Sequence, residues 1–257
     1  MTGIDRIVSE LPTITLEELL EVAALLNRTD RKYVVTADQF GALVAELTGD
    51  IRVLTLNGGR TFRYESMYFD TAERDSYRAA AHRRRHRFKV RTRSYVESAD
   101  TYLEVKVRDA RRRTVKVRTP YAFANRSTLT AEARAFVAGV FADHGIDAAL
   151  VDGLVPTLHT EFRRTTVLVP SAGCRMTVDT DLTLSQPGGA SRTIPDLIIL
   201  ETKSDAQDRR VDRALWRMGI RPQSVSKFAI GSALLDPALP SNKWSRTMNR
   251  HFDVAED

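Results

Sequence analysis

The sequence predicts an α+β protein with a largely antiparallel sheet, and three observations support this fold class. Several segments alternate apolar with charged residues, which is typical of strands that bury one face. Helical patterns lie among them, but strands and helices do not alternate regularly as in parallel βαβ folds. The chain has 257 residues, of which 42% are hydrophobic and 28% charged, so it is long enough for a substantial core and is not intrinsically disordered.

The N-terminal quarter predicts two helices separated by a strand. Thr15 can cap the first helix, and Glu18 completes a capping box. Thr36 can cap the second helix, and Gly58 favours a turn in the segment that follows. In order, we expect a loose lead-in, a helix, a strand, a helix and a loop at Met1–Pro12, Leu16–Leu26, Asp30–Val35, Ala37–Leu47 and Ile51–Thr61.

The rest of the chain is dominated by strand patterns. The predicted strands are Arg63–Phe69, Arg87–Arg93, Leu103–Arg108, Thr114–Arg118, Thr157–Thr160, Glu161–Val169, Arg175–Leu182 and Ile194–Lys203. The predicted helices are Ala131–Asp143, Asp208–Met218 and Lys227–Leu235. A proline followed by two glycines predicts a loop over Gln186–Ser191.

Composition excludes several classes of protein. The single cysteine, Cys174, excludes a disulfide framework and a thiolate-only zinc site, and we expect it to be a small core residue. No apolar run approaches the ~20 residues of a membrane span, and no signal pattern opens the chain, so we expect a cytoplasmic protein. The motifs G-x-x-x-x-G-K-[ST], G-x-G-x-x-G and H-E-x-x-H are absent, and the five histidines show no metal-ligand spacing.

Basic residues recur on one face of successive predicted strands, in a chain of net charge +6. These strands carry Arg87, Lys89, Arg91 and Arg93, then Lys106 and Arg108, then Lys116 and Arg118. A solvated sheet face explains any single strand, but like charges on neighbouring strands repel unless an anion lies between them. A sheet that curls with these cations inward would bind a polyanion, because arginine pairs bidentately with phosphate.

Acidic residues share these strand faces. Glu104 lies two residues before Lys106, Glu201 lies two residues before Lys203, and Asp179 follows a basic strand start. Carboxylate oxygens suit Mg²⁺ or Mn²⁺, which would be shared with phosphate oxygens. Salt bridges between these carboxylates and the neighbouring cations are the other interpretation, and the sequence leaves both open.

A series of short motifs carries a resemblance to a known family. The motifs are Asp30-Arg31-Lys32-Tyr33, Ser66-Met67-Tyr68-Phe69-Asp70-Thr71, Lys89-Val90-Arg91-Thr92-Arg93, Leu103-Glu104-Val105-Lys106, Val115-Lys116-Val117-Arg118, Phe162-Arg163-Arg164, Arg175-Met176-Thr177-Val178-Asp179, Leu200-Glu201-Thr202-Lys203 and Ser226-Lys227-Phe228. In this order and spacing they resemble the VTC (vacuolar transporter chaperone) domain. That domain is the polyphosphate polymerase-like branch of the triphosphate tunnel metalloenzymes and is related to CYTH domains.

The resemblance implies an antiparallel eight-stranded β-barrel that forms a tunnel, with helices packed outside. The tunnel domain would span residues 27–236, after a lead-in and helix over 1–26 and before a tail over 237–257. Phosphates would be bound by Lys32, Arg91, Arg93, Lys106, Lys116, Arg164, Arg175, Lys203, Ser226 and Lys227. The implied catalytic residues are Lys32, Arg91, Arg93, Lys106, Lys116 and Glu201. Glu201 would hold Mn²⁺ or Mg²⁺, with Glu104 and Asp179 as further metal-side candidates.

Two positions depart from the family's pattern. Asp30 stands where the family usually has glutamate, so a salt bridge or metal contact there would shift. Phe162 lacks the hydroxyl group of the family's usual tyrosine, which removes one hydrogen bond.

The resemblance implies transfer of the γ-phosphoryl group of ATP, or another nucleoside triphosphate, to a polyphosphate chain. A triphosphatase of the same fold is one alternative, and a non-catalytic module that binds polyphosphate or inositol phosphate is another. Nucleic acid is not expected as a partner, because the aromatic residues, 7% of the chain, do not interleave with the basic strands. The arginine runs Arg83–Arg85 and Arg111–Arg113 are interpreted as surface or tunnel-mouth charge. Protein partners are not predicted.

Overall fold

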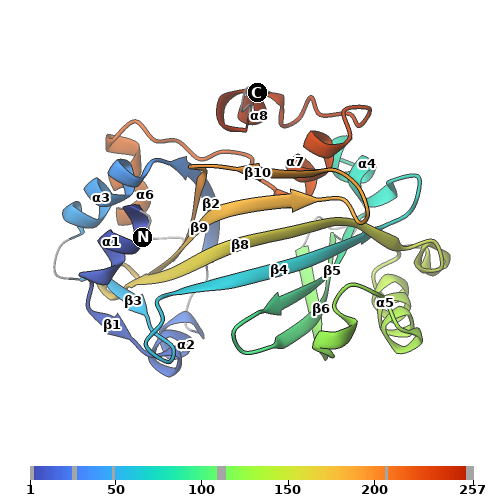
Figure 1. Ribbon diagram of the computed structural model, residues 1–257, viewed down its shortest axis with the longest axis horizontal. Coiled ribbons are helices and arrows are strands. Elements are labelled where there is room, and N and C mark those ends of the chain that lie inside the picture. The colour runs from blue at the N-terminus through green and yellow to red at the C-terminus, as the bar shows by residue number, and fades with distance from the viewer. Residues whose placement is uncertain (1–2, 25–27, 48–49, 109–113, 206–207, 253–257) are drawn as a thin grey trace.

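A computed structural model describes residues 3–24, 28–47, 50–108, 114–205 and 208–252 (Figure 1). Eight antiparallel strands form the main sheet in the spatial order β2-β11-β9-β8-β4-β5-β6-β7. Their bounds are β2 Arg28–Val35, β4 Thr61–Asp70, β5 Arg87–Tyr95, β6 Asp100–Arg108, β7 Thr114–Tyr121, β8 Val155–Val169, β9 Cys174–Ser185 and β11 Ile198–Asp205. The predicted α+β class with eight antiparallel strands is confirmed.

Three short strands and eight helices complete the described structure. The strand β3 (Arg52–Leu54) pairs with β8 and with β1 (Thr13–Ile14), and β10 (Ser191–Ile194) pairs with β9. The helices are α1 Gly3–Ser9, α2 Leu16–Ala24, α3 Ala37–Glu46, α4 Asp75–Ala81, α5 Ala131–Asp143, α6 Arg210–Arg217, α7 Lys227–Leu235 and α8 Ser245–His251. In the described part of the chain, no helix is both long and apolar enough to cross a membrane.

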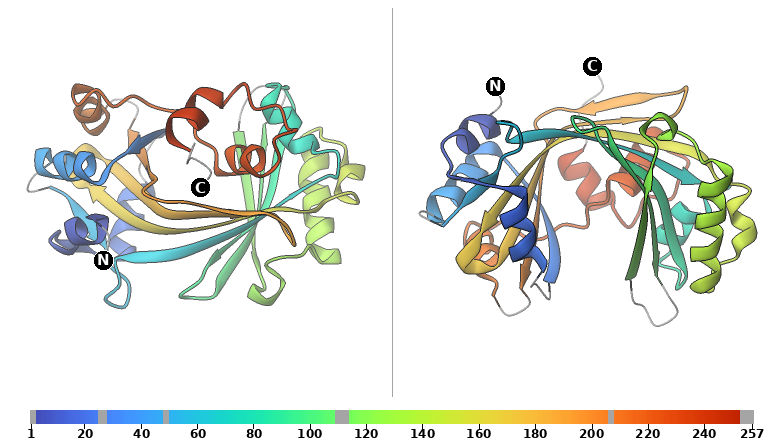
Figure 2. Two further views of the ribbon diagram at one scale, coloured as in Figure 1. Left: turned by 45° about the horizontal axis from the view of Figure 1, so that its top comes forward. Right: turned by 90° about the horizontal axis from the view of Figure 1, so that it is seen from below.

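The sheet curls into an arch. Figure 2 shows β2, β9 and β11 on one side of the arch and β5 and β6 on the other. Among the described residues, β2 pairs only with β11 and β7 only with β6, so backbone hydrogen bonds do not close the arch into a complete barrel. The segment before α7 connects the two sides instead. The Gln223 N–H donates to the Lys32 carbonyl at 2.7 Å, and Lys89 Nζ donates to Ser226 Oγ at 3.1 Å.

Four helices, α1, α3, α5 and α6, cover the outer face of the arch. On one side, α1, α3 and α6 bury Tyr33, Met176 and Leu200, which point away from the inside of the curve. On the other side, α5 packs against the outward valines of β5 and β6 (Figure 2). Burial of alternate strand residues beneath helices is what fixes the orientation of the remaining, charged face.

The helix α7 instead lies inside the curve of the arch (Figure 2). Its Phe228 and Ile230 pack with Tyr68, Leu158 and Ile199 in one buried cluster. The approach is close enough to require glycine at position 231, where a Cβ atom would lie 2.9 Å from Leu184 Cδ2. One end of the inner face is therefore apolar and covered.

Several local predictions were wrong. The expected lead-in Met1–Pro12 contains α1, whose Ile4 and Val8 bury against the α3 side of the core. The expected loop Ile51–Thr61 contains β3. The helices α4 and α8 and the strand β10 were not predicted. All of these elements are at most seven residues long, so their periodicity is weak and tertiary contacts decide them.

A buried carboxylate ties α6 to the sheet. Asp212 is fully buried and accepts hydrogen bonds from Arg31 Nη1, Tyr33 Oη and Thr202 Oγ1, each at 2.7 Å. Arg31 and Tyr33 flank Lys32 on β2, and Thr202 follows Glu201 on β11. Two members of the first motif, Arg31 and Tyr33, therefore stabilise the outer face, while Lys32 between them points inward.

Candidate functional site

Cross-strand register places the predicted site residues on the inner face of the arch. Direct partners on neighbouring strands share a face, and the pairs run Lys32–Glu201, Asp179–Arg164, Arg91–Glu104 and Lys106–Lys116. The inner face, as we use the term, carries Lys32, Arg91, Arg93, Glu104, Lys106, Lys116, Arg164, Arg175, Asp179, Glu201 and Lys203. Ser226 and Lys227 join them from the start of α7.

Glu104 is held by cations from three strand positions. Arg91 donates to Glu104 Oε2 through Nε at 2.8 Å and Nη2 at 2.6 Å, and Lys116 forms an ion pair with Oε1. Arg93 Nε lies 4.0 Å from Oε2. Burial opposes ionisation of Glu104, but the charges of Arg91, Arg93 and Lys116 outweigh it and lower its pKa to about 2. Glu104 is therefore a charged counter-ion for β5 and β7.

Asp179 has a similar role on the other side of the arch. Arg164 binds both of its carboxylate oxygens, and Lys227 of α7 forms a further ion pair with Oδ2. Burial opposes ionisation, but Arg164 and Lys227 outweigh it and lower the pKa of Asp179. This cluster joins β8, β9 and α7.

Glu201 is the least enclosed by cations of the three predicted metal-side carboxylates. Lys203 Nζ lies 2.9 Å from its Oε1, and Lys32 is its cross-strand neighbour. Burial raises the pKa of Glu201, but Lys32 and Lys203 outweigh burial and lower it to about 2. The carboxylate is thus ionised at neutral pH and is paired through one oxygen.

Of the three predicted metal-side carboxylates, Glu201 fits a divalent cation best, because only one of its oxygens is paired with a cation in the described structure. Among the described residues, no three His, Cys, Asp or Glu side chains gather into a metal cluster. Cations engage both carboxylate oxygens of Glu104 and both of Asp179, which leaves these two groups poorly suited to a metal. A single carboxylate still fits Mg²⁺ or Mn²⁺ when substrate phosphates supply further oxygens, which is common for Mg²⁺.

Several polar groups on the inner face lack partners within the described part of the chain. Arg93 Nε, Ser66 Oγ and Thr177 Oγ1 are buried and form no hydrogen bond. Ser66 is the cross-strand neighbour of Arg93, and Thr177 that of Glu201. Buried polar groups are normally satisfied, so this face is suited to a ligand rich in oxygen atoms.

Lys89 was not among the predicted site residues, although it lies on the same basic strand. Burial lowers the pKa of Lys89 to about 7, and the charges of Lys32, Lys106 and Arg91 add to this effect. Lys32 is on the opposite side of the arch, so the two sides are within electrostatic reach of each other. Its alternation with Arg91 and Arg93 had already placed Lys89 on the predicted basic face, but no family motif assigned it a role.

Tyr68 was also missed. Arg91 Nη1 donates to its hydroxyl at 3.0 Å, and its ring stacks against Phe228 of α7. Tyr68 belongs to the motif that spans Ser66 to Thr71, but nothing in the sequence indicates that its hydroxyl faces Arg91.

The two departures from the family's pattern have local explanations. Phe162 presents its ring to Lys227 Nζ at 4.2 Å and to the Arg164 guanidinium at 5.2 Å, so cation–π contacts stand where the hydroxyl is absent. Asp30 pairs across the strands with Lys203 and is exposed. It therefore lies at the margin of the inner face.

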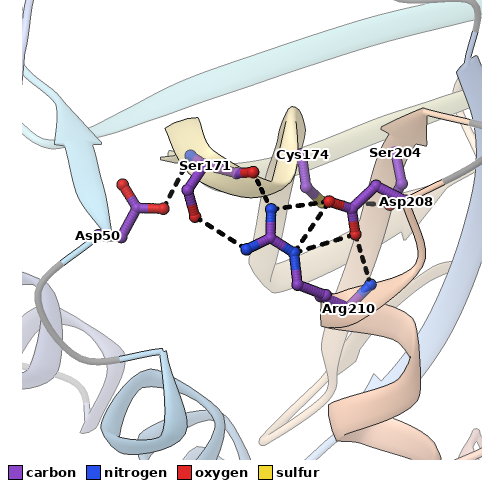
Figure 3. Close-up of polar contacts among 6 residues, drawn as sticks. All are labelled: Asp50, Ser171, Cys174, Ser204, Asp208 and Arg210. Atoms are coloured by element: carbon purple, nitrogen blue, oxygen red, sulfur yellow. Dashed lines mark hydrogen bonds and ion pairs between the residues drawn. The ribbon is translucent and has the colours of Figure 1, made fainter.

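The other candidates lie away from the inner face. Cys174 is buried beside Ser204, whose Oγ donates to Sγ at 3.3 Å, and burial raises its thiol pKa to about 11 (Figure 3). The expected core role of Cys174 is confirmed. Near it, Arg210 binds Asp208 and Ser171 at the edge of a cavity of about 360 Å³ (Figure 3). Arg83–Arg85 are exposed, whereas Arg111–Arg113 lie outside the described residues.

Comparison with known proteins gives both weak and strong similarities. No curated protein matches the sequence. Similar solved structures include a candidate adenylate cyclase from Bacillus halodurans, with 13% identity, a TM-score of 0.49, and coverage of 77% of this chain and 93% of that chain. A candidate adenylyl cyclase from Hippeastrum, described as having a dominant triphosphatase activity, has 15% identity, a TM-score of 0.47, and coverage of 84% and 99%. Similarities this low do not transfer an activity to this chain.

The match to a protein family covers most of the chain. The VTC domain matches residues 27–236, which includes every strand of the main sheet as well as α7. The chain therefore belongs to the VTC domain family.

Proposed function

We propose that the inner face binds a chain of linked phosphates, and that the protein transfers the γ-phosphoryl group of a nucleoside triphosphate to a polyphosphate acceptor. One observation carries the proposal. Cations from both sides of the arch face one another across the inner face, and Lys106 has no hydrogen-bonded partner or ion pair among the described residues. Lys32, Lys89 and Lys106 repel one another here without an ion-pair partner in the described structure, which favours a ligand that carries many negative charges.

In the proposed reaction, an oxygen of the acceptor's terminal phosphate attacks the γ-phosphorus in line. The bond between that phosphorus and the β–γ bridging oxygen breaks, so the γ-phosphoryl group becomes the new chain end and a nucleoside diphosphate leaves. Arg91, Arg93 and Arg164 would neutralise and orient the phosphates. The reaction needs no covalent protein nucleophile.

Within this proposal, Glu201 holds the divalent cation together with phosphate oxygens. Bound Mg²⁺ or Mn²⁺ would stabilise negative charge on the transferred group. Glu104 and Asp179 keep Arg91 and Arg164 in place, because each carboxylate binds its arginine through two hydrogen bonds. The chain's own residues thus bind and orient the substrate.

The test is incubation of the purified protein with γ-labelled ATP and Mn²⁺, followed by separation of free phosphate from long polymer. Labelled polymer supports the proposal. Release of free phosphate alone would mean a triphosphatase. Tight tripolyphosphate binding without any turnover would mean a binding module, and omission of Mn²⁺ is the control for metal dependence.

A further inference from the structure

The basic rows of the inner face continue beyond the residues assigned above. Arg87 pairs with Arg108 across β5 and β6, two residues beyond the pair Lys89–Lys106 on each strand. Side chains two residues apart share a face, so Arg87 and Arg108 extend the inner face by ~7 Å. This extension lies at the start of β5, away from the Arg93 end.

Two more cations reach this edge from outside the sheet. Lys243 Nζ donates to the Ala80 carbonyl at 2.6 Å, close to the end of α4. Burial lowers the pKa of Lys243, and the charges of Arg83 and Arg108 lower it further. The charge of Lys243 in turn contributes to lowering the pKa of Lys89. Positive charges therefore follow one another from Arg83 at the surface to Lys89 on the inner face.

We propose that a basic lip, made of Arg83, Arg87, Arg108 and Lys243, binds the part of a polyphosphate chain that extends out of the inner face. The proposal rests on the proposed function, because it takes the inner face as the site of the chain's end. Four residues separate Arg91 from Arg87, which corresponds to ~13 Å along the strand. A triphosphate held at Arg91 and Arg93 does not reach the lip, whereas a longer chain does, so the lip selects for chain length.

The lip favours a bare phosphate chain over a nucleic acid. Single-stranded nucleic acids bind proteins largely by stacking bases on exposed aromatic rings. Trp244, the tryptophan next to Lys243, is only 3% exposed, and Lys243 Nζ lies 4.9 Å from the centre of its ring. The indole ring of Trp244 is therefore not available for stacking, and the four lip residues themselves offer charge.

The test compares two double variants that each remove two positive charges. Arg83→Gln with Lys243→Gln alters the lip. Arg6→Gln with Arg213→Gln is the matched control, since both arginines are exposed and lie on α1 and α6, far from α4 (Figure 1). Dissociation constants are measured for tripolyphosphate and for a long polyphosphate of defined length, each over a range of salt concentrations.

We expect the lip variant to bind the long chain about tenfold more weakly, with a salt dependence that is reduced by about one counterion per lost cation. Its tripolyphosphate affinity should stay within about twofold of wild type, which also shows that the variant is folded. The single variant Arg83→Gln, at an exposed position, should show a smaller loss in the same direction. The control variant should match wild type for both ligands.

Three results would contradict the proposal that the lip binds polyphosphate. One is equal weakening of long-chain binding in the lip and control variants, which would mean diffuse surface attraction. Another is an unchanged long-chain affinity in a lip variant that still binds tripolyphosphate. The third is an equal loss of affinity for a single-stranded RNA of matched charge, which would indicate a nucleic-acid site. Failure of the proposed function has a different signature, because Arg93→Ala would then leave tripolyphosphate binding intact.

Discussion

Arg164 and Asp179 face each other across β8 and β9 and form a two-pronged ion pair, with Nε–Oδ1 at 2.6 Å and Nη2–Oδ2 at 2.8 Å. Lys227, at the start of α7, binds the same carboxylate. One aspartate therefore holds two of the predicted phosphate-binding cations and anchors the helix that covers one end of the inner face. This arrangement gives Asp179 a structural role that can be separated from metal binding.

Asp179→Asn should destabilise the protein without weakening anion binding. Removing one partner of a buried ion pair leaves uncompensated charge, which costs about 3 kcal/mol or more of unfolding free energy. Chemical denaturation measures this loss, and calorimetry should give a tripolyphosphate affinity equal to or tighter than that of wild type. Glu161→Gln, at a more exposed carboxylate, is the control and should stay within about 0.5 kcal/mol. Normal stability combined with lost metal dependence would instead make Asp179 a metal ligand.

Glu201→Gln should abolish turnover and keep tripolyphosphate binding. The amide has the same shape but no charge, so it is a poor ligand for Mg²⁺ or Mn²⁺, while the surrounding cations stay in place. We expect a rate loss of at least about a hundredfold in the γ-labelled ATP assay, and a binding constant within about threefold of wild type by calorimetry. If binding disappears along with activity in a folded variant, the role of Glu201 is structural.

Arg91 and Arg93 should differ when each is replaced by alanine. Arg93→Ala should leave the stability of the ligand-free protein almost unchanged, because its buried Nε has no hydrogen-bonded partner in the described structure. Arg91→Ala should lower it, because Glu104 loses two hydrogen bonds. Differential scanning fluorimetry at fixed ionic strength measures both effects.

Both arginine variants should lose most of the stabilisation by ligand. At a hundredfold excess over Kd, a ligand that binds only the folded state adds about 2.7 kcal/mol, or roughly 5–10 °C in Tm for a chain of this size. Arg6→Ala with Arg213→Ala, at exposed positions on α1 and α6, should keep the full shift. An equal loss in this control would show that tripolyphosphate is attracted to the whole surface.

Lys89 should make both stability and binding depend on pH. Its pKa in the folded protein is about 7, against 10.5 for an ordinary lysine, and the groups that lower it further are Lys32, Lys106, Arg91 and Lys243. Between pH 7 and 10.5 the unfolded chain binds more protons at this residue, so its contribution to stability rises with pH. Lys89→Met should reduce this rise by up to about 1.4 kcal/mol per pH unit, as measured by chemical denaturation at several pH values.

A bound polyanion should restore the proton to Lys89. Tripolyphosphate binding at pH 8 is then accompanied by uptake of about one proton, which calorimetry detects in buffers of different ionisation enthalpy. Affinity should fall as the pH rises from 7 to 9. Lys89→Met should bind with almost no proton uptake, and equal uptake in the variant and wild type would rule out this assignment.

Much of the candidate site could be predicted from the sequence, because strand alternation is a local property. The order Lys89, Arg91 and Arg93 on one strand already puts three cations on one face. The repeated motifs on later strands then predicted that these faces meet, and the register of the arch places their residues side by side. Long elements such as α5 were also predictable, because helical periodicity over 13 residues is a strong signal.

Only the tertiary structure decided what each carboxylate faces. Glu104, Asp179 and Glu201 look alike in the sequence, yet Glu104 and Asp179 each face several cations, whereas Glu201 is paired through one oxygen. The partners of Glu104 and Asp179 lie on other strands and on α7, so they depend on how far the sheet curls. Arg31 and Tyr33 face outward, and Lys32 inward, because the first two bind the buried Asp212. Asp212 is 181 residues from Arg31, so this choice of face also depends on tertiary structure. Local periodicity thus determined which side chains share a face, whereas long-range packing and electrostatics determined their partners.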